Sequence, residues 1–144
     1  GYNVYCAARS LKKMEPLRTL GGKWGAEFQI SEVLLPLGKQ VIESRRGLTS
    51  AHANPWFGID REGTASETHG DVWFGALAYS GNWKIVVERN AYGQTMVAGG
   101  INDFDHGWKL AGGEAFSTPS FVAGFPRIAP AVASIQPGST VASV

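Results

Sequence analysis

The sequence predicts an all-β fold, an antiparallel β-sandwich. Nineteen glycines and seven prolines, many of them between short apolar stretches, divide the chain in the way that turns divide a strand-rich protein. Apolar residues rarely recur at helical spacing, whereas several short segments alternate with the period of two that a strand requires. The regular spacing of these short segments favours a sandwich.

The predicted elements follow the chain in order. Residues 2–7 form either a strand or a short helix, because periodicity does not separate the two there. Gly112 and Gly113 predict a turn before the last strand, in which Pro119 favours an edge position or a strand start. Strands are predicted where Gly, Pro, Asn or Asp bounds a short apolar run, at residues 25–33, 39–44, 55–60, 72–79, 83–88, 94–99, 107–110 and 118–125.

Residues 72–79 and 83–88 give the clearest strand pair. The segment Ser80-Gly81-Asn82 between them predicts a tight hairpin, in which Gly81 takes the positive φ that such a turn needs. Apolar side chains lie on both faces of these two strands. The pair therefore suits the inside of a sandwich, or a sheet pressed against another domain.

Length and composition predict one domain or part of one, since 144 residues with 44% hydrophobic residues can bury a substantial core. Within it we expect a divergent or non-native start at 1–16, a sandwich segment at 17–125 and a low-complexity tail at 126–144. The tail consists mostly of small residues and has no aromatic side chain. We expect it to be loosely attached.

Charge and hydropathy bear on partners and location. Thirteen basic residues against twelve acidic ones, largely dispersed, give no sign of a nucleic-acid-binding surface. No apolar run approaches the ~18 residues of a membrane span. The single cysteine, Cys6, excludes an internal disulfide, which favours a cytoplasmic protein.

Neither a metal site nor a cofactor is predicted. His52, His69 and His106 are far apart in the sequence, with no Cys or His at ligand spacing. Asp103 and Asp105 form the densest polar cluster together with His106, but they follow Gly99 and Gly100 and fit an Asx-closed turn better. A complete small hydrolase using these two aspartates remains an open alternative.

No catalytic residue is predicted. Glycoside hydrolysis generally uses two carboxyl groups, ~5 Å apart when the enzyme retains stereochemistry. The other acids near one another lie in or beside the polar loop 61–70, where a surface connection normally carries charge. These acids are Asp60, Glu62, Glu67 and Asp71.

The chain contains five tryptophans, at positions 24, 56, 73, 83 and 108. Tryptophan usually packs in cores and interfaces, and we expect that role for most of them. Trp56 and Trp108 each lie next to a turn, where an indole can stack on a sugar ring. They are the predicted carbohydrate contacts, and they support an alternative function as a free-standing carbohydrate-binding sandwich.

Several segments, in the same order and spacing, resemble the N-terminal domain of glycoside hydrolase family 36 α-galactosidases. The resemblance spans about residues 17–125. The segments are Leu20-Gly-Gly-Lys-Trp-Gly, Glu43-Ser-Arg-Arg-Gly, Asn54-Pro-Trp-Phe, His69-Gly-Asp-Val-Trp-Phe, Tyr79-Ser-Gly-Asn-Trp, Gly100-Ile-Asn-Asp-Phe and Gly113-Glu-Ala-Phe-Ser-Thr-Pro.

The resemblance implies part of a β-supersandwich that precedes a (β/α)8 barrel. The barrel of such an enzyme removes terminal α-linked galactose with retention, through two aspartates that both belong to the barrel. The expected function is thus a non-catalytic structural domain of an α-galactosidase-like enzyme, with no catalytic residue carried over to this chain. The implied partners are the enzyme's own barrel, further copies in a homo-oligomer, and galactosides bound by the whole enzyme.

Overall fold

The computed structural model describes residues 4–8, 15–61, 63, 65–66, 68–104, 107–125 and 127–128. These residues contain strands and connections but no helix, and hence no helix that could span a membrane. The strands are β1 (Val4–Ala8), β2 (Pro16–Lys23), β3 (Ala26–Leu34), β4 (Gly38–Ser44), β5 (Ala53–Asp60), β6 (Gly70–Leu77), β7 (Trp83–Arg89), β8 (Thr95–Ile101), β9 (Phe121–Gly124) and β10 (Arg127–Ile128).

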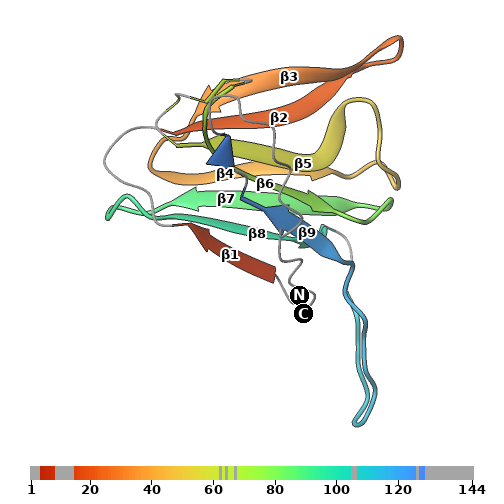
Figure 1. Ribbon diagram of the computed structural model, residues 1–144. Helices are drawn as coiled ribbons and strands as arrows, with labels where there is room; N and C mark the ends of the chain where they lie inside the picture. Colours follow the sequence, from red (N-terminus) through yellow and green to blue (C-terminus); the bar gives the residue numbers. More distant parts are fainter. Residues whose placement is uncertain are drawn as a thin grey trace.

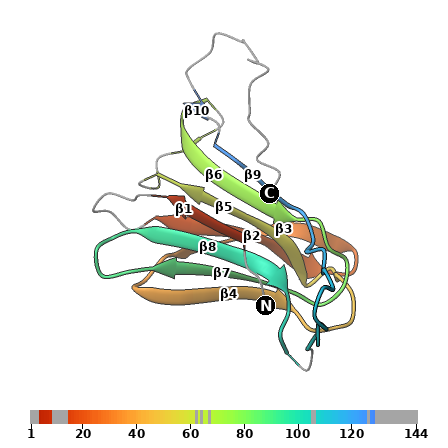
Figure 2. The ribbon, with the colours of Figure 1, turned by 90° about the horizontal axis from the view of Figure 1, so that it is seen from below.

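The strands form two sheets that pack face to face (Figures 1 and 2). Sheet A has the order β1-β8-β7-β4. Sheet B has the order β10-β6-β5-β2-β3, and β9 pairs with β6 next to β10. All pairings are antiparallel, so the predicted all-β, antiparallel sandwich is confirmed.

The core lies between the sheets because each inner strand directs alternate side chains inward. On β7, Trp83, Ile85 and Val87 are completely buried. They face Phe57 and Ile59 of β5, which are almost completely buried. The intervening residues of both strands point to the outer faces.

Most predicted strands are confirmed, with boundaries shifted by a few residues, but the structure differs from the predictions in several places. Residues 107–110 form no strand, and all four are exposed. Strand β2 was not predicted, although it pairs with both β3 and β5. Its sequence begins with Pro16 and contains Gly21 and Gly22, which indicate turns, and its register shifts at Gly21.

The predicted hairpin between residues 72–79 and 83–88 is wrong. Strand β6 lies in sheet B and β7 in sheet A, so the connection at 78–82 crosses from one sheet to the other. The backbone of this connection forms hydrogen bonds with two other connections. The Thr49 N–H donates to Ser80 O, and the Asn102 N–H donates to Asn82 O. Gly81 is not among the residues with positive φ. The apolar character of both strands arises because each contributes to the core from an opposite sheet.

The chain ends are described only in part. Residues 4–8 form a strand, which resolves the open choice between strand and helix there, and β1 pairs with β8 at the edge of sheet A. Residues 1–3 and 9–14 lie outside the described residues. Of the expected tail, residues 127–128 form β10, and the remainder lies outside the described residues.

Candidate functional site

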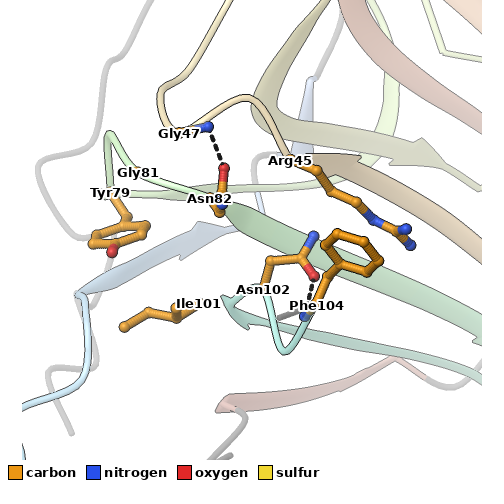
Figure 3. A pocket seen from close by; sticks show the side chains of 8 residues that line it. All are labelled: Arg45, Gly47, Tyr79, Gly81, Asn82, Ile101, Asn102 and Phe104. Atoms are coloured by element: carbon orange, nitrogen blue, oxygen red, sulfur yellow. Dashed lines mark hydrogen bonds between the residues drawn. The ribbon is translucent and has the colours of Figure 1, made fainter. Parts of the chain in front are cut away.

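A pocket of about 370 Å³ opens at one end of the sandwich, where three connections meet. They follow β4, join β6 to β7, and follow β8 (Figure 3). Long-range pairing of β4, β7 and β8 in sheet A brings these segments together. The pocket is lined by Arg45, Gly47, Tyr79, Gly81, Asn82, Ile101, Asn102 and Phe104.

Asn82 ties the three connections to one another. The Gly47 N–H donates to Asn82 Oδ1 over 2.5 Å. The Asn82 carbonyl accepts a hydrogen bond from the Asn102 N–H over 2.9 Å. Gly47 has a φ of 76°, a left-handed conformation that glycine adopts without strain. The walls of the pocket are therefore fixed by hydrogen bonds within the chain.

Asn102 forms the floor of the pocket and is 1% exposed. Its Nδ2 donates to Glu43 Oε2 over 2.9 Å and to the Trp83 carbonyl over 3.3 Å. Its Oδ1 accepts from the Phe104 N–H over 2.9 Å, which closes an Asx turn after β8. Because both ends of this amide are used within the protein, Asn102 holds the turn in place.

Arg45 and Phe104 form one side of the pocket. The Arg45 guanidinium carbon lies 4.3 Å from the centroid of the Phe104 ring, in a cation–π contact. Arg45 Nη2 also lies 2.7 Å from Glu43 Oε1. The guanidinium is thus held on a ring and balanced by a carboxylate, while half of the arginine side chain is exposed.

Tyr79 forms the opposite side. Its half-buried ring lies against Gly81, where an added Cβ would come within 2.7 Å of the phenolic oxygen. Within the described part of the chain, no hydrogen bond is formed by Tyr79 Oη or Asn82 Nδ2. Both groups can therefore bond to a ligand. The pocket combines hydrogen-bond donors with aromatic rings, as sites for small polar molecules do.

Sequence reasoning missed this pocket because its residues come from three separate turns. A signal was nevertheless present in the sequence. Three of the segments that carry the family resemblance contain lining residues, namely those at 43–47, 79–83 and 100–104. These segments are distant in sequence but meet at one end of the fold.

The predicted sugar contacts lie elsewhere. Trp56 is half-buried on β5, and its ring lies over Gly58, where an added Cβ would be 2.9 Å from Trp56 Cη2. Trp108 is 61% exposed and packs on Phe116, with ring centroids 4.7 Å apart. It belongs to residues 107–120, which extend away from the sandwich (Figure 1). Neither residue lines the pocket, and their contact with carbohydrate stays a prediction.

The acidic residues considered in the sequence occupy different settings. Asp60 is fully buried, and its Oδ2 lies 2.7 Å from Arg18 Nη1. Asp71 pairs with Arg61 over 3.2 Å. Asp103 is exposed after β8, within the Asx turn that Asn102 closes, so the predicted Asx turn is present there. Its hydrogen bond with Lys84 lowers the pKa of the Asp103 carboxyl. Glu62, Glu67 and Asp105 lie outside the described residues.

Two of the three histidines are described. His52 is exposed, and His69 Nδ1 lies 2.7 Å from Ser66 Oγ. His106 lies outside the described residues. Among the residues that the structure does describe, no three His, Cys, Asp or Glu side chains gather in a way that could hold a metal ion.

Comparison with known proteins places this arrangement in a family. The family model of the glycosyl hydrolase family 36 N-terminal domain matches residues 4–111. The α-galactosidase AgaA of Geobacillus stearothermophilus is 40% identical over 103 residues, which cover 72% of this chain and 14% of that protein. The α-galactosidase Mel36A of Lactobacillus acidophilus is 40% identical over 101 residues, 70% of this chain and 14% of that protein.

Solved structures agree with the sequence comparison. The crystal structure of AgaA superposes with a TM-score of 0.80 and 33% identity, covering 87% of this chain and 17% of that one. The α-galactosidase from Lactobacillus brevis gives a TM-score of 0.80 at 26% identity, covering 87% and 16%. The chain thus spans about 14% of the length of the curated relatives. The chain belongs to the family of glycosyl hydrolase family 36 N-terminal domains.

Proposed function

We propose that this chain serves as a non-catalytic structural domain of a glycoside hydrolase that removes terminal α-linked galactose with retention. The relatives named above are α-galactosidases, and each is several times longer than the matched segment. In this proposal a separate catalytic barrel performs the chemistry, and the sandwich packs against another domain of the enzyme through the outer face of sheet B. The single cysteine supports a cytoplasmic location.

The outer face of sheet B carries the proposal, because two sets of paired apolar residues lie on it. Ile30 on β3 is paired with Leu20 on β2. Trp56 on β5 is paired with Ala76 on β6, which is paired in turn with Val122 on β9. Residues paired in an antiparallel register point to the same face. Ile30 is 68% exposed and Val122 is 45% exposed, so each set includes a residue that is open to a partner.

Two aromatic rings extend this apolar surface. Trp56 lies over Gly58, and Phe74 of β6 lies over Gly124 of β9, where an added Cβ would be 2.7 Å from Phe74 Cζ. Both rings lie over positions that carry no side chain. With the Trp56 and Phe74 rings, the apolar residues form a patch beside the Arg18–Glu32 ion pair of the same face, and such a patch can mark an interaction surface.

The outer face of sheet A carries charged pairs beside an apolar row, in which Val41 of β4 is paired with Val86 of β7 and Val86 with Ala98 of β8. Lys39 on β4 forms an ion pair with Glu88 on β7 over 3.8 Å. Glu43 stands opposite Lys84 in the same register. Charged pairs across two neighbouring strands are typical of a sheet face in contact with water. Sheet B also carries charge on its outer face, where Arg18 pairs with Glu32 and Asp60, so the proposal of sheet B as the packing side rests on its exposed apolar residues, its two aromatic rings and its edge strand.

The exposure of strand β3 also indicates that the interface lies on the sheet B side of the molecule. Strand β3 is the edge strand of sheet B, and eight of its nine residues are exposed. An exposed edge strand offers unpaired backbone N–H and C=O groups to a neighbouring chain segment. We propose that another part of the same enzyme covers this edge, with a second copy in a homo-oligomer as the alternative.

A chimera tests the proposal. Residues 4–125 of this chain replace the matching segment of AgaA, alone or with Ile30→Lys and Val122→Lys together. The control chimera carries Val41→Lys, at a 53% exposed position on the outer face of sheet A. Burying two lysines at an interface costs several kcal/mol. We therefore expect the double variant to lose soluble, correctly sized enzyme by more than about tenfold.

Size-exclusion chromatography and hydrolysis of an aryl α-galactoside measure the outcome. The unmodified and Val41→Lys chimeras are expected to elute as assembled enzyme and to hydrolyse the substrate. Equal assembly and activity of the double-lysine and Val41→Lys chimeras would exclude sheet B as the packing face. An unmodified chimera that is soluble but inactive would contradict the structural role itself.

A further inference from the structure

We propose that the pocket at the end of the sandwich binds one pyranose ring of an uncharged saccharide. This inference goes beyond the domain role proposed above and does not depend on it. It rests on the available hydrogen-bonding groups in the pocket, its apolar surface, its charge balance and its size.

The available polar groups match sugar hydroxyls. Tyr79 Oη can donate or accept a hydrogen bond, and Asn82 Nδ2 can donate one. Arg45 has further N–H donors besides the group that lies 2.7 Å from Glu43. These groups come from two of the three connections and line the same cavity (Figure 3). A sugar hydroxyl both donates and accepts, so it can bond to each of these groups.

The apolar part of the pocket suits the C–H face of a sugar ring. Phe104 is 54% exposed, and the half-buried Ile101 also lines the pocket. The Tyr79 ring bounds the cavity from the other side (Figure 3). Concave sites with apolar rings and a few oriented polar groups are typical of small-molecule binding.

Charge favours a neutral ligand over an acidic one. A single arginine would attract a carboxylate or a phosphate, but Arg45 is already 2.7 Å from Glu43 Oε1. Glu43 also accepts a hydrogen bond from Asn102, so its carboxylate is fixed beside the pocket. The negative charge of Glu43 would repel an anionic sugar but not an uncharged one.

Size and rigidity agree with the assignment. The cavity of about 370 Å³ falls near the lower end of the range of ligand pockets, as a single ring requires. Hydrogen bonds from Gly47 and Asn102 to Asn82 hold the walls before any ligand arrives. Binding therefore needs little ordering of the protein, which reduces its entropic cost.

Titration of the purified chain with methyl α-galactopyranoside, followed by two-dimensional NMR of backbone and side-chain amides, tests the proposal. We expect saturable shifts of the Asn82 side-chain amide. Tyr79→Phe removes only the hydroxyl and keeps the ring over Gly81. Asn82→Asp removes the free donor and keeps the acceptor for the Gly47 N–H. Each substitution is expected to weaken binding by about tenfold, the equivalent of one good hydrogen bond.

Tyr92→Phe is the matched control, because Tyr92 is 89% exposed in the β7–β8 turn, at the opposite end of these two strands from the pocket. It should leave the affinity unchanged, and thermal unfolding checks that every variant is folded. A parallel titration with glucuronic acid should show weaker binding than the neutral glycoside. Absence of saturable shifts would overturn the proposal, as would equal affinity in Tyr79→Phe, Asn82→Asp and Tyr92→Phe.

Loss of affinity in Trp108→Ala but not in Tyr79→Phe would also overturn the proposal. It would place the sugar on the segment at 107–120 instead. The proposal is separable from the domain role, since the pocket variants leave the outer face of sheet B intact. Failure of sugar binding with a fully assembled chimera would reject the pocket alone.

Discussion

The ring of Phe121 occupies the space that a side chain at Gly99 would fill. A Cβ built on Gly99 would lie 2.7 Å from Phe121 Cε2, closer than real Cβ contacts come. Gly75 gives room to the same ring, at 2.9 Å from Phe121 Cε1. Because Phe121 belongs to sheet B and Gly99 to sheet A, this contact interlocks the two sheets.

Gly99→Ala is therefore expected to destabilise the sandwich. The added methyl group must displace the Phe121 ring in a packed core, which costs about 1–3 kcal/mol. Urea unfolding monitored by tryptophan fluorescence measures the change. Gly112→Ala is the control, because no atom lies within 4 Å of a Cβ there, and it should change stability by less than about 0.5 kcal/mol. Equal stability of the two variants would show that the contact is not tight.

Arg18→Met is expected to be far more damaging than Lys39→Met. Arg18 is the ion-pair partner of Asp60, which is completely buried, so its loss leaves an uncompensated charge and costs about 3–5 kcal/mol. Lys39 is 64% exposed and 3.8 Å from Glu88, and such surface pairs contribute about 0–1 kcal/mol. Denaturant midpoints of the two variants at neutral pH give the comparison. Similar midpoints would contradict the structural role of the buried pair.

Lys84→Met is expected to remove a pH-dependent part of stability. The hydrogen bond from Lys84, together with its charge, lowers the pKa of the exposed Asp103 carboxyl below its ordinary value of 3.8. A carboxyl with a lowered folded-state pKa stabilises the fold above its unfolded pKa, and the effect is lost as the pH falls through the folded pKa. Melting temperatures of wild type and variant should differ near neutral pH and converge in acid. A difference that persists in acid would exclude this cause.

The fold class could be predicted from the sequence because alternation is local. In β7 the segment from Trp83 to Arg89 alternates between core and outer face, and its own sequence reveals this. The sheet to which each strand belongs is not local information. The turn residues Ser80 to Asn82 are compatible with a hairpin, yet the partners of β6 and β7 are distant strands, and packing between two sheets decided the path.

The pocket was beyond sequence reasoning for a related physical reason. Arg45 and Asn102 become neighbours through Glu43, and this contact exists only once β4, β7 and β8 have paired. The predicted contacts Trp56 and Trp108 were selected because each adjoins a turn. Their surroundings, an apolar sheet face and a segment extending from the sandwich, depend on tertiary structure.

The most direct test of the structural role is hydrolysis of an aryl α-galactoside by the purified chain. If the chemistry belongs to a separate catalytic barrel, release of the aryl group should equal that of a buffer blank. Release above the blank that disappears when Asp103 is replaced by asparagine would contradict this account, because it would give the sandwich a catalytic carboxylate of its own.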